Sequence, residues 1–244
     1  MDLAGLKGST PYGYTADSSP AARSPESPPR GKPMRPIPAN DLRTNLATWA
    51  VAPELVPAVT SRMLEIMPRE SFDPCFAGQQ LETTYFDDAA FALRKARKEG
   101  KRYLTIRVRH YLPSDTYAFS AKTESGKFRI ALPADEARNL IEGGCNAYML
   151  KFLPADLLAR LLDLTDDVER LRPVTTICFR RYAVENSHNR LTLDIKIETD
   201  TGKCFPCDVL EYKSTEPHSD PYEEFLTLGL RPVKLSKFLW ATRT

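Results

Sequence analysis

The sequence has no long apolar run, no secretory leader and no even set of cysteines. No stretch approaches the ~18 consecutive apolar residues that a membrane-spanning helix needs, so we expect no membrane span. The opening residues, MDLAGLKGST, lack the charged-then-apolar layout of a secretory signal. Five cysteines in a chain of 244 residues do not suggest a disulfide framework. We therefore expect reduced thiols in a soluble, cytoplasmic protein.

A strong charge of one sign is also lacking. Lysine and arginine number 34 against 32 acidic residues, which leaves a formal net charge of +2. Such a balance does not indicate a nucleic-acid binder, and we expect no nucleic-acid partner. Any basic site must arise from a local arrangement of side chains. The remaining composition, 42% hydrophobic and 27% charged, is ordinary for a globular protein.

The chain divides near residue 40. Residues 1–40 are rich in proline, serine and arginine and have few large apolar side chains, so they cannot bury enough surface to offset their ordering entropy. We predict that this tail is disordered. Residues 41–244 have a globular composition without interruption or internal repeat, and their length suits one domain.

Strands and helices alternate along the globular part. Asp87 or Asp88 is expected to cap the second helix, and the segment 115–132 reads as a strand or as a hairpin around Ser125 and Gly126. The other predicted strands are 42–51, 80–88, 101–111, 173–184, 189–200 and 207–214; the predicted helices are 52–67, 89–100, 133–144, the clearest part of 146–171, and 220–230. This pattern predicts an α+β fold with a largely antiparallel sheet.

Charged side chains alternate with apolar ones along several strands. In LTIRVRHY (104–111), Arg107 and Arg109 share one face, while Ile106, Val108 and His110 share the other. One interpretation is an antiparallel sheet with one face in water, which periodicity by itself favours. The other is a barrel with a polar lumen and an outer face covered by helices. Periodicity does not separate the two, and His110 on the apolar face is expected to be structural.

Seven short motifs occur in a specific order. They are TTYFDD followed by a helix, IRVRHY, FSAKTE, FRRYAV, RLTLD, VLEYK and LSKF, spread over residues 42–240. This series resembles the VTC domain, the catalytic module of vacuolar transporter chaperone polyphosphate polymerases. That domain is one of the triphosphate tunnel metalloenzymes, which include the CYTH proteins. The resemblance implies an antiparallel eight-stranded β-barrel, or triphosphate tunnel, with helices packed outside.

The resemblance also implies roles for particular residues. The catalytic, phosphate-binding bases would be Arg107, Arg109, Lys122, Arg181, Arg190 and Lys237. Lys213 and Ser236 would bind phosphate as well. Glu211 would hold a divalent metal, Mn²⁺ or Mg²⁺, with Asp194 as a second ligand. Basic residues with fork geometry suit polyphosphate, whose only recognisable feature is its repeated negative charge.

Four positions depart from the family pattern. The acid-x-lysine pair of the first strand is replaced by Leu46 and Thr48, an expected glutamate by Ser120, and an often basic position by Ile195. Metal ligation has thus lost up to two acids, for which Asp194, Glu124 or Glu198 would have to compensate.

Two function hypotheses follow. The first is a polyphosphate polymerase-like phosphotransferase that moves the γ-phosphate of a nucleoside triphosphate onto polyphosphate, with triphosphatase activity as its variant. The second is a non-catalytic polyphosphate-binding module.

The other motifs in the sequence give weaker indications of function. CFPC (204–207) precedes a strand instead of opening a helix, which favours buried or half-buried thiols over a redox or zinc site. The basic helix at 93–102 is either a solvated face or a patch that guides a polyanion to the tunnel mouth. No P-loop, dinucleotide-binding glycine pattern or serine-nucleophile elbow is present in the sequence.

Overall fold

The computed structural model describes residues 44–69, 73, 75–100, 102–143, 150–165, 168–216 and 222–243. The predicted disordered tail, residues 1–40, lies outside the described residues. No helix within these ranges is long and apolar enough to cross a membrane.

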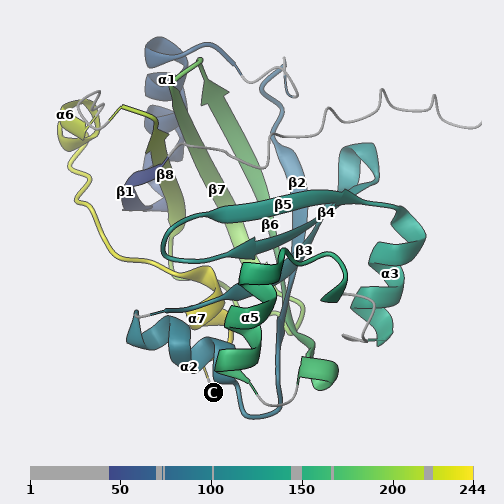
Figure 1. Ribbon diagram of the computed structural model, residues 1–244. Coiled ribbons are helices and arrows are strands. Elements are labelled where there is room, and N and C mark those ends of the chain that lie inside the picture. The colour runs from purple at the N-terminus through teal and green to yellow at the C-terminus, as the bar shows by residue number, and fades with distance from the viewer. Residues whose placement is uncertain are drawn as a thin grey trace, which may run out of the picture. The chain divides into compact units, whose positions relative to one another are not determined.

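Eight antiparallel strands form one sheet (Figure 1). In chain order they are β1 (Thr44–Val51), β2 (Gln79–Asp87), β3 (Thr105–Tyr111), β4 (Thr116–Lys122), β5 (Lys127–Leu132), β6 (Arg172–Glu185), β7 (Asn189–Thr199) and β8 (Asp208–Ser214). Their order in the sheet is β1-β8-β7-β6-β2-β3-β4-β5. The predicted strands are all present, and the segment 115–132 is a hairpin, β4–β5.

Helices were also largely as expected, with one omission. They are α1 (Val56–Ile66), α2 (Ala92–Glu99), α3 (Ala134–Gly143), α5 (Ala155–Leu164), α6 (Tyr222–Leu226) and α7 (Lys237–Ala241), with single 3₁₀ turns η1 (Pro53–Leu55), η2 (Leu112–Ser114) and η3 (Val168–Arg170). The sequence interpretation left the end of the chain as a tail and so missed α7. Within the predicted helical segment 146–171, residues 146–149 and 166–167 lie outside the described residues.

The sheet is strongly curled. In a flat sheet β8 and β5 would be six strand spacings apart, about 29 Å. Burial has the largest effect on the pKa of Lys127 on β5, which it lowers. Nearby positive charges lower this pKa further, and Lys213 on β8 is one of them. Such an influence requires the two strands to face each other at short range. In Figure 1 the β4–β5 hairpin accordingly crosses in front of β6 and β7. We call the concave face of this curled sheet the lumen face.

The curled sheet is tunnel-like, as predicted, although hydrogen bonds do not join its two edge strands in the part of the chain that the structure describes. β1 pairs with β8 and β5 pairs with β4, and the described residues show no β1–β5 ladder. The chain that leads to α7 instead lines part of the edge of β1. The Val233 amide donates to the Thr48 carbonyl (2.7 Å), and Pro232 forms an isolated bridge with Trp49.

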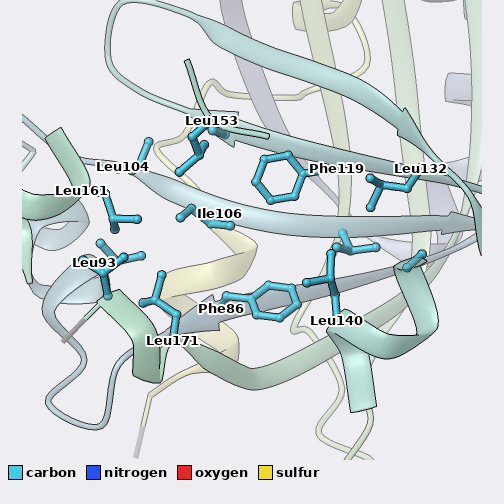
Figure 2. Close-up of a cluster of buried hydrophobic side chains, with 14 of the residues drawn as sticks. Phe86, Leu93, Leu104, Ile106, Phe119, Leu132, Leu140, Leu153, Leu161 and Leu171 are labelled. Atoms are coloured by element: carbon cyan, nitrogen blue, oxygen red, sulfur yellow. The ribbon is translucent and has the colours of Figure 1, made fainter. Parts of the chain in front are cut away.

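Apolar clusters lie on the outer face, between the sheet and the helices. Phe86, Ile106 and Phe119 pack from the strands against Leu93 of α2 and Leu161 of α5 (Figure 2). All five side chains are fully buried, and each such burial stabilises the fold by about 1.5–3 kcal/mol. Helices thus bury the outer face, and the curl of the sheet, which brings β5 across from β8, excludes the alternative of an open sheet whose polar face lies in water.

A second outer cluster lies beneath α1. It joins Trp49 and Tyr212 of the strands to Val59 and Met63 of the helix. Helices therefore cover the outer face at both ends of the strand order. The lumen face carries the charged side chains, together with apolar ones such as Phe179 of a third cluster.

Two aspartates cap α2, as predicted. Asp87 accepts hydrogen bonds from the amides of Leu93 (2.9 Å) and Arg94 (2.8 Å), and Asp88 accepts one from Ala92 (2.9 Å). Free amides at a helix start need such acceptors, and carboxylates also suit the positive end of the helix dipole. These acids are structural.

His110 is also structural. Its ring stacks on Tyr117 with centroids 4.1 Å apart, and its Nε2 lies 2.9 Å from Asp115 Oδ1.

Candidate functional site

The strand register sets a row of polar and apolar side chains across the lumen face, with Tyr85 of β2 opposite Arg107 of β3. Residues directly opposite in an antiparallel pair point to the same side of the sheet. Lys213 is paired with Arg190, and Asp194 with Arg181. The row continues through β2 and β3 to β4 and β5, where Arg107 is paired with Ser120, Ser120 with Arg129, and Lys122 with Lys127.

Basic side chains dominate this face. Among the described residues they are Arg107, Arg109, Lys122, Lys127, Arg129, Arg181, Arg190 and Lys213, joined by Lys237 from α7. The structure thus brings together all six bases that the sequence interpretation selected as catalytic. It adds Lys127 and Arg129, which that interpretation missed. The alternation in KFRIAL, read together with the hairpin pairing, would have placed both on the same face as Lys122.

Asp194 lies at the centre of the lumen face and is fully buried. Arg181 binds it through both oxygens, Nε to Oδ1 at 2.5 Å and Nη2 to Oδ2 at 2.6 Å. Lys237 Nζ lies 2.8 Å from Oδ2. Burial alone would raise the pKa of Asp194, but the charges of Arg181 and Lys237 lower it to about 2. Asp194 is therefore a carboxylate at neutral pH.

Glu211 is the second acid on this face, and its contacts are looser. Lys213 Nζ lies 3.5 Å from Oε2, and Lys237 Nζ lies 3.8 Å from Oε1. Burial would raise the pKa of Glu211, but these two lysines lower it well below its usual range. Thr48 of β1 and Thr192 of β7 are its partners in the strand register.

Positive charge exceeds negative charge on the lumen face. Burial lowers the pKa of Lys213 to about 8, against a partial opposing effect of Glu211, and Arg181 and Arg190 lower it further. Burial and neighbouring arginines also lower the pKa of Arg129 to about 9. Buried cations are unfavourable unless they are paired. An anionic ligand on this face would relieve that cost.

Neutral side chains orient the guanidinium groups. Arg107 Nε donates to Ser120 Oγ (3.0 Å), and Arg109 Nε donates to Thr83 Oγ1 (3.1 Å). Because Ser120 is uncharged, Arg107 has a neutral partner there. Its charge is therefore available to a ligand.

The helix α7 carries Lys237 into the site. Ser236 begins the helix, and its Oγ accepts a hydrogen bond from the Leu239 amide at 3.4 Å. The Phe238 ring stacks on Tyr85 with centroids 5.0 Å apart, in an apolar cluster that also contains Phe179. Ser236, predicted to bind phosphate, thus serves as a helix cap in this structure.

The metal expectation fits only in part. The described residues contain no group of three or more histidine, cysteine, aspartate or glutamate side chains that could hold a metal. Both oxygens of Asp194 are engaged by bases, whereas Glu211 has only long contacts. Mg²⁺ is commonly held by one or two carboxylates plus substrate phosphates and water. Glu211 fits that role better than Asp194.

Two of the three suggested substitute ligands do not lie at the site. Glu124 and Glu198 are exposed, and Glu124 is paired with Arg160 of α5. Ile195 packs in the outer cluster beneath α1, so its lack of charge does not affect the lumen face. The side chain of Leu46 lies outside the described residues.

The remaining sequence motifs stay outside this site. Cys204 is exposed, which corrects the expectation of a buried thiol, and Cys207 is half-buried. Burial raises the pKa of Cys207, which does not favour a reactive thiolate. On α2, Arg97 stacks over the Tyr103 ring at 3.9 Å. Its charge is among those that, after burial, lower the pKa of Lys122, so this part of α2 lies near the lumen face.

Comparison with known proteins agrees with this geometry. The sequence profile of the VTC domain matches residues 45–244. A candidate adenylate cyclase from Bacillus halodurans has a similar structure, with a TM-score of 0.59, 18% identity, and 82% of this chain and 97% of that chain covered.

A second similar structure is a candidate adenylyl cyclase from Hippeastrum, described as having a dominant triphosphatase activity. Its TM-score is 0.54 at 16% identity, with 80% of this chain and 93% of that chain covered. At these identities the likeness shows the fold. Among curated proteins, no sequence matches significantly.

Proposed function

The chain belongs to the VTC domain family, and from this premise we propose that its tunnel is a phosphotransferase site. In the proposed reaction, a terminal oxygen of a polyphosphate chain attacks the γ-phosphate of a nucleoside triphosphate, the bond to the β–γ bridging oxygen breaks, and the nucleoside diphosphate leaves. One observation carries the proposal: the lumen face concentrates buried and half-buried bases in excess of its carboxylates, which are Asp194, Glu211 and Glu185. A linear chain of phosphates matches that charge, and several arginines supply the planar forks that suit phosphate oxygens.

Six of the bases on the lumen face have roles in this proposal. Arg107 and Arg109, side by side on β3, bind adjacent phosphates of the nucleotide. Arg181 and Lys237 stabilise the negative charge on the transferred phosphoryl group, since positioned positive charge is the main contribution to phosphoryl transfer. Lys122 and Lys213, from opposite strands of the curled sheet, hold the acceptor chain in line.

A divalent cation, Mn²⁺ or Mg²⁺, belongs to this proposal as well. It would neutralise charge on the phosphate oxygens when bound. Glu211 would hold it, with phosphate oxygens and water as the other ligands. Asp194 then remains a structural anion that keeps Arg181 and Lys237 in place.

Proteins of this fold have different named activities, so the reaction products must distinguish transfer to polyphosphate from hydrolysis. Purified protein would be incubated with ATP and Mn²⁺, and both polyphosphate and free phosphate would be measured. Polyphosphate without free phosphate supports the proposal. Free phosphate alone would replace it with triphosphate hydrolysis, in which water is the acceptor.

A second candidate function is polyphosphate binding without catalysis. It is favoured by the two bases that occupy the oxygens of Asp194 and by Ser120 in place of a family glutamate. Retained binding of polyphosphate with neither product formed would establish this second candidate.

A further inference from the structure

The β4–β5 hairpin carries two lysines beside its turn. Lys122 ends β4, Lys127 begins β5, and the two are directly opposite in the register. Like charges directly opposite in a sheet repel. After burial, the charges of Arg107 and Lys213 are among those that lower the pKa of Lys127. Lys122 and Lys127 therefore bring unfavourable like-charge contacts to the tip of the hairpin, which Glu211 offsets in part at Lys122.

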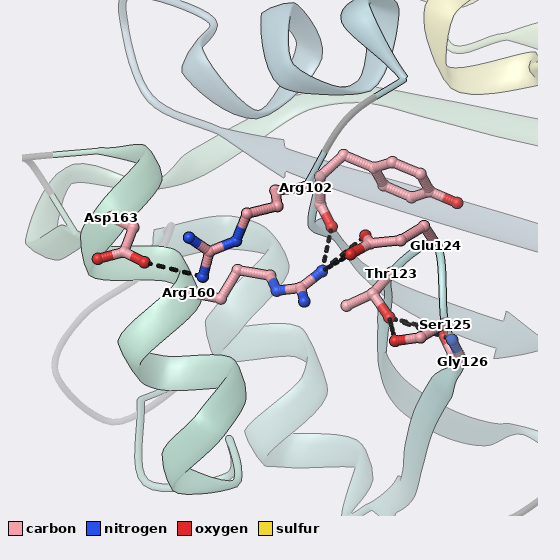
Figure 3. A network of polar contacts seen from close by, with 8 residues as sticks. Arg102, Thr123, Glu124, Ser125, Gly126, Arg160 and Asp163 are labelled. Atoms are coloured by element: carbon pink, nitrogen blue, oxygen red, sulfur yellow. Dashed lines mark hydrogen bonds and ion pairs between the residues drawn. The ribbon is translucent and has the colours of Figure 1, made fainter.

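The turn itself is well ordered by hydrogen bonds. The Thr123 amide donates to the Gly126 carbonyl (2.8 Å), and the Gly126 amide donates to Thr123 Oγ1 (3.1 Å). Ser125 Oγ lies 3.1 Å from the same hydroxyl. This turn places Glu124 against Arg160 of α5 (Figure 3).

Arg160 of α5 forms an ion pair with Glu124. Its Nη1 donates to both carboxylate oxygens of Glu124, each at 2.6 Å, and lies 3.4 Å from the Tyr103 carbonyl (Figure 3). Arg160 is only 18% exposed, and the next residue, Leu161, is part of the buried outer cluster. The contact thus ties the hairpin tip to a helix that is fixed by the core.

β5 depends on this contact more than an inner strand would. It is at the edge of the sheet, and its only strand partner among the described residues is β4. Inner strands are held from both sides.

We propose that the Glu124–Arg160 ion pair is a positioning clamp. It holds the hairpin tip against the repulsion of the lumen bases, so that Lys122 and Lys127 stay directed at a polyanion. Both members lie outside the tunnel and touch no ligand. The affinity part of this inference rests on the proposed function, because it uses a phosphate chain as ligand.

The clamp and a simple charge effect predict opposite changes in polyanion affinity for one variant. Glu124→Gln removes a negative charge near a phosphate site, which on its own would tighten polyanion binding. Loss of the clamp would weaken binding instead. Arg160→Gln weakens binding under either explanation, so Glu124→Gln is the informative variant.

The same helix offers a matched control. Asp163 of α5 accepts a hydrogen bond from Arg102 at 3.2 Å, an exposed pair that does not involve the hairpin (Figure 3). Asp163→Asn removes the same charge from α5 without releasing the tip. It separates a general loss of negative charge from loss of the clamp.

Binding would be measured by calorimetry with inorganic tripolyphosphate. Glu124→Gln and Arg160→Gln are each expected to raise the Kd roughly three- to fivefold, the range of a partly exposed ion pair. Asp163→Asn should leave the Kd unchanged, and Glu124→Arg combined with Arg160→Glu should recover most of the affinity. Tighter or unchanged binding by Glu124→Gln would overturn the proposal.

A double-variant test distinguishes positioning from a general structural role. In a background of Lys122→Gln and Lys127→Gln, Glu124→Gln should have no further effect on the Kd, because the groups that it positions are gone. A persistent threefold loss in that background would reject the clamp.

Hydrogen exchange gives a readout that needs no ligand. Amides of residues 117–132 should exchange faster in Glu124→Gln than in the wild type or in Asp163→Asn. Absence of tripolyphosphate binding by the wild type would contradict the proposed function, and exchange alone would then decide on the clamp. Unchanged exchange in Glu124→Gln would overturn it.

Discussion

Arg181 and Asp194, opposite each other on β6 and β7, form a bidentate ion pair in the centre of the lumen face. Asp194 is fully buried, and Lys237 of α7 also contacts it. A buried pair of this kind contributes little net stability, but removal of one member leaves an uncompensated charge. Asp194 therefore fixes the positions of Arg181 and Lys237 in a site where bases outnumber acids.

Asp194→Asn should destabilise the free protein and strengthen its response to ligand. Loss of the carboxylate leaves Arg181 and Lys237 without their buried anion, at a cost of about 3–5 kcal/mol. The same two bases become available to phosphate. Thermal unfolding should show a lower Tm without ligand and a larger rise in Tm with tripolyphosphate than in the wild type. An unchanged Tm would show that the pair has no structural role, and exposed Asp163→Asn is the control.

Glu211→Gln should separate turnover from binding. If Glu211 is the main metal ligand, the variant loses metal-dependent turnover, while polyphosphate binding stays the same or becomes tighter because a negative charge has left a phosphate site. Arg107→Ala should instead weaken binding by about 1–3 kcal/mol through loss of a charge-assisted contact. Activity assays and calorimetry on both variants check this division of roles. Full activity in Glu211→Gln would place the metal elsewhere.

The fold and most of the candidate bases could be predicted from the sequence. Strand alternation placed Arg107 and Arg109 on one face, and the order of motifs indicated a tunnel. Alternation is local, however, and does not reveal which strands face each other across a curled sheet. The proximity of Lys127 on β5 to Lys213 on β8 therefore became apparent only in the structure.

Two features of the site were beyond the sequence interpretation for physical reasons. α7 is five residues long, too short for helical periodicity to stand out, and its position depends on Phe238 packing into a distant apolar cluster. Asp194 looked like a metal ligand because carboxylates commonly are. Its bidentate partner Arg181 lies on another strand, and only the register brings them together.

Phe238→Ala should disturb the site through α7. The side chain is buried and stacks on Tyr85, so its removal should cost about 3–5 kcal/mol of unfolding free energy. Because Lys237 is the preceding residue, tripolyphosphate binding should also weaken. Denaturant unfolding and calorimetry measure the two effects, with Leu235→Ala, at a position that is 36% exposed, as the control. Wild-type affinity in a destabilised Phe238→Ala would show that α7 does not position Lys237.

Polyphosphate binding should weaken as the pH rises through about 8. Lys213 has its pKa lowered to about 8 from 10.5, so without ligand it loses its proton in the mildly alkaline range. A phosphate chain favours the protonated form, and binding above that pKa must therefore take up a proton. The free folded protein shows the opposite trend: because the folded state holds this proton less tightly than the unfolded state, stability from Lys213 rises between pH 8 and 10.5. Calorimetry with tripolyphosphate from pH 6.5 to roughly 9.5 should show the loss of affinity. Lys213→Arg keeps its charge over this range and should lose less affinity than the wild type. Identical pH profiles for the two proteins would exclude Lys213 as the titrating group.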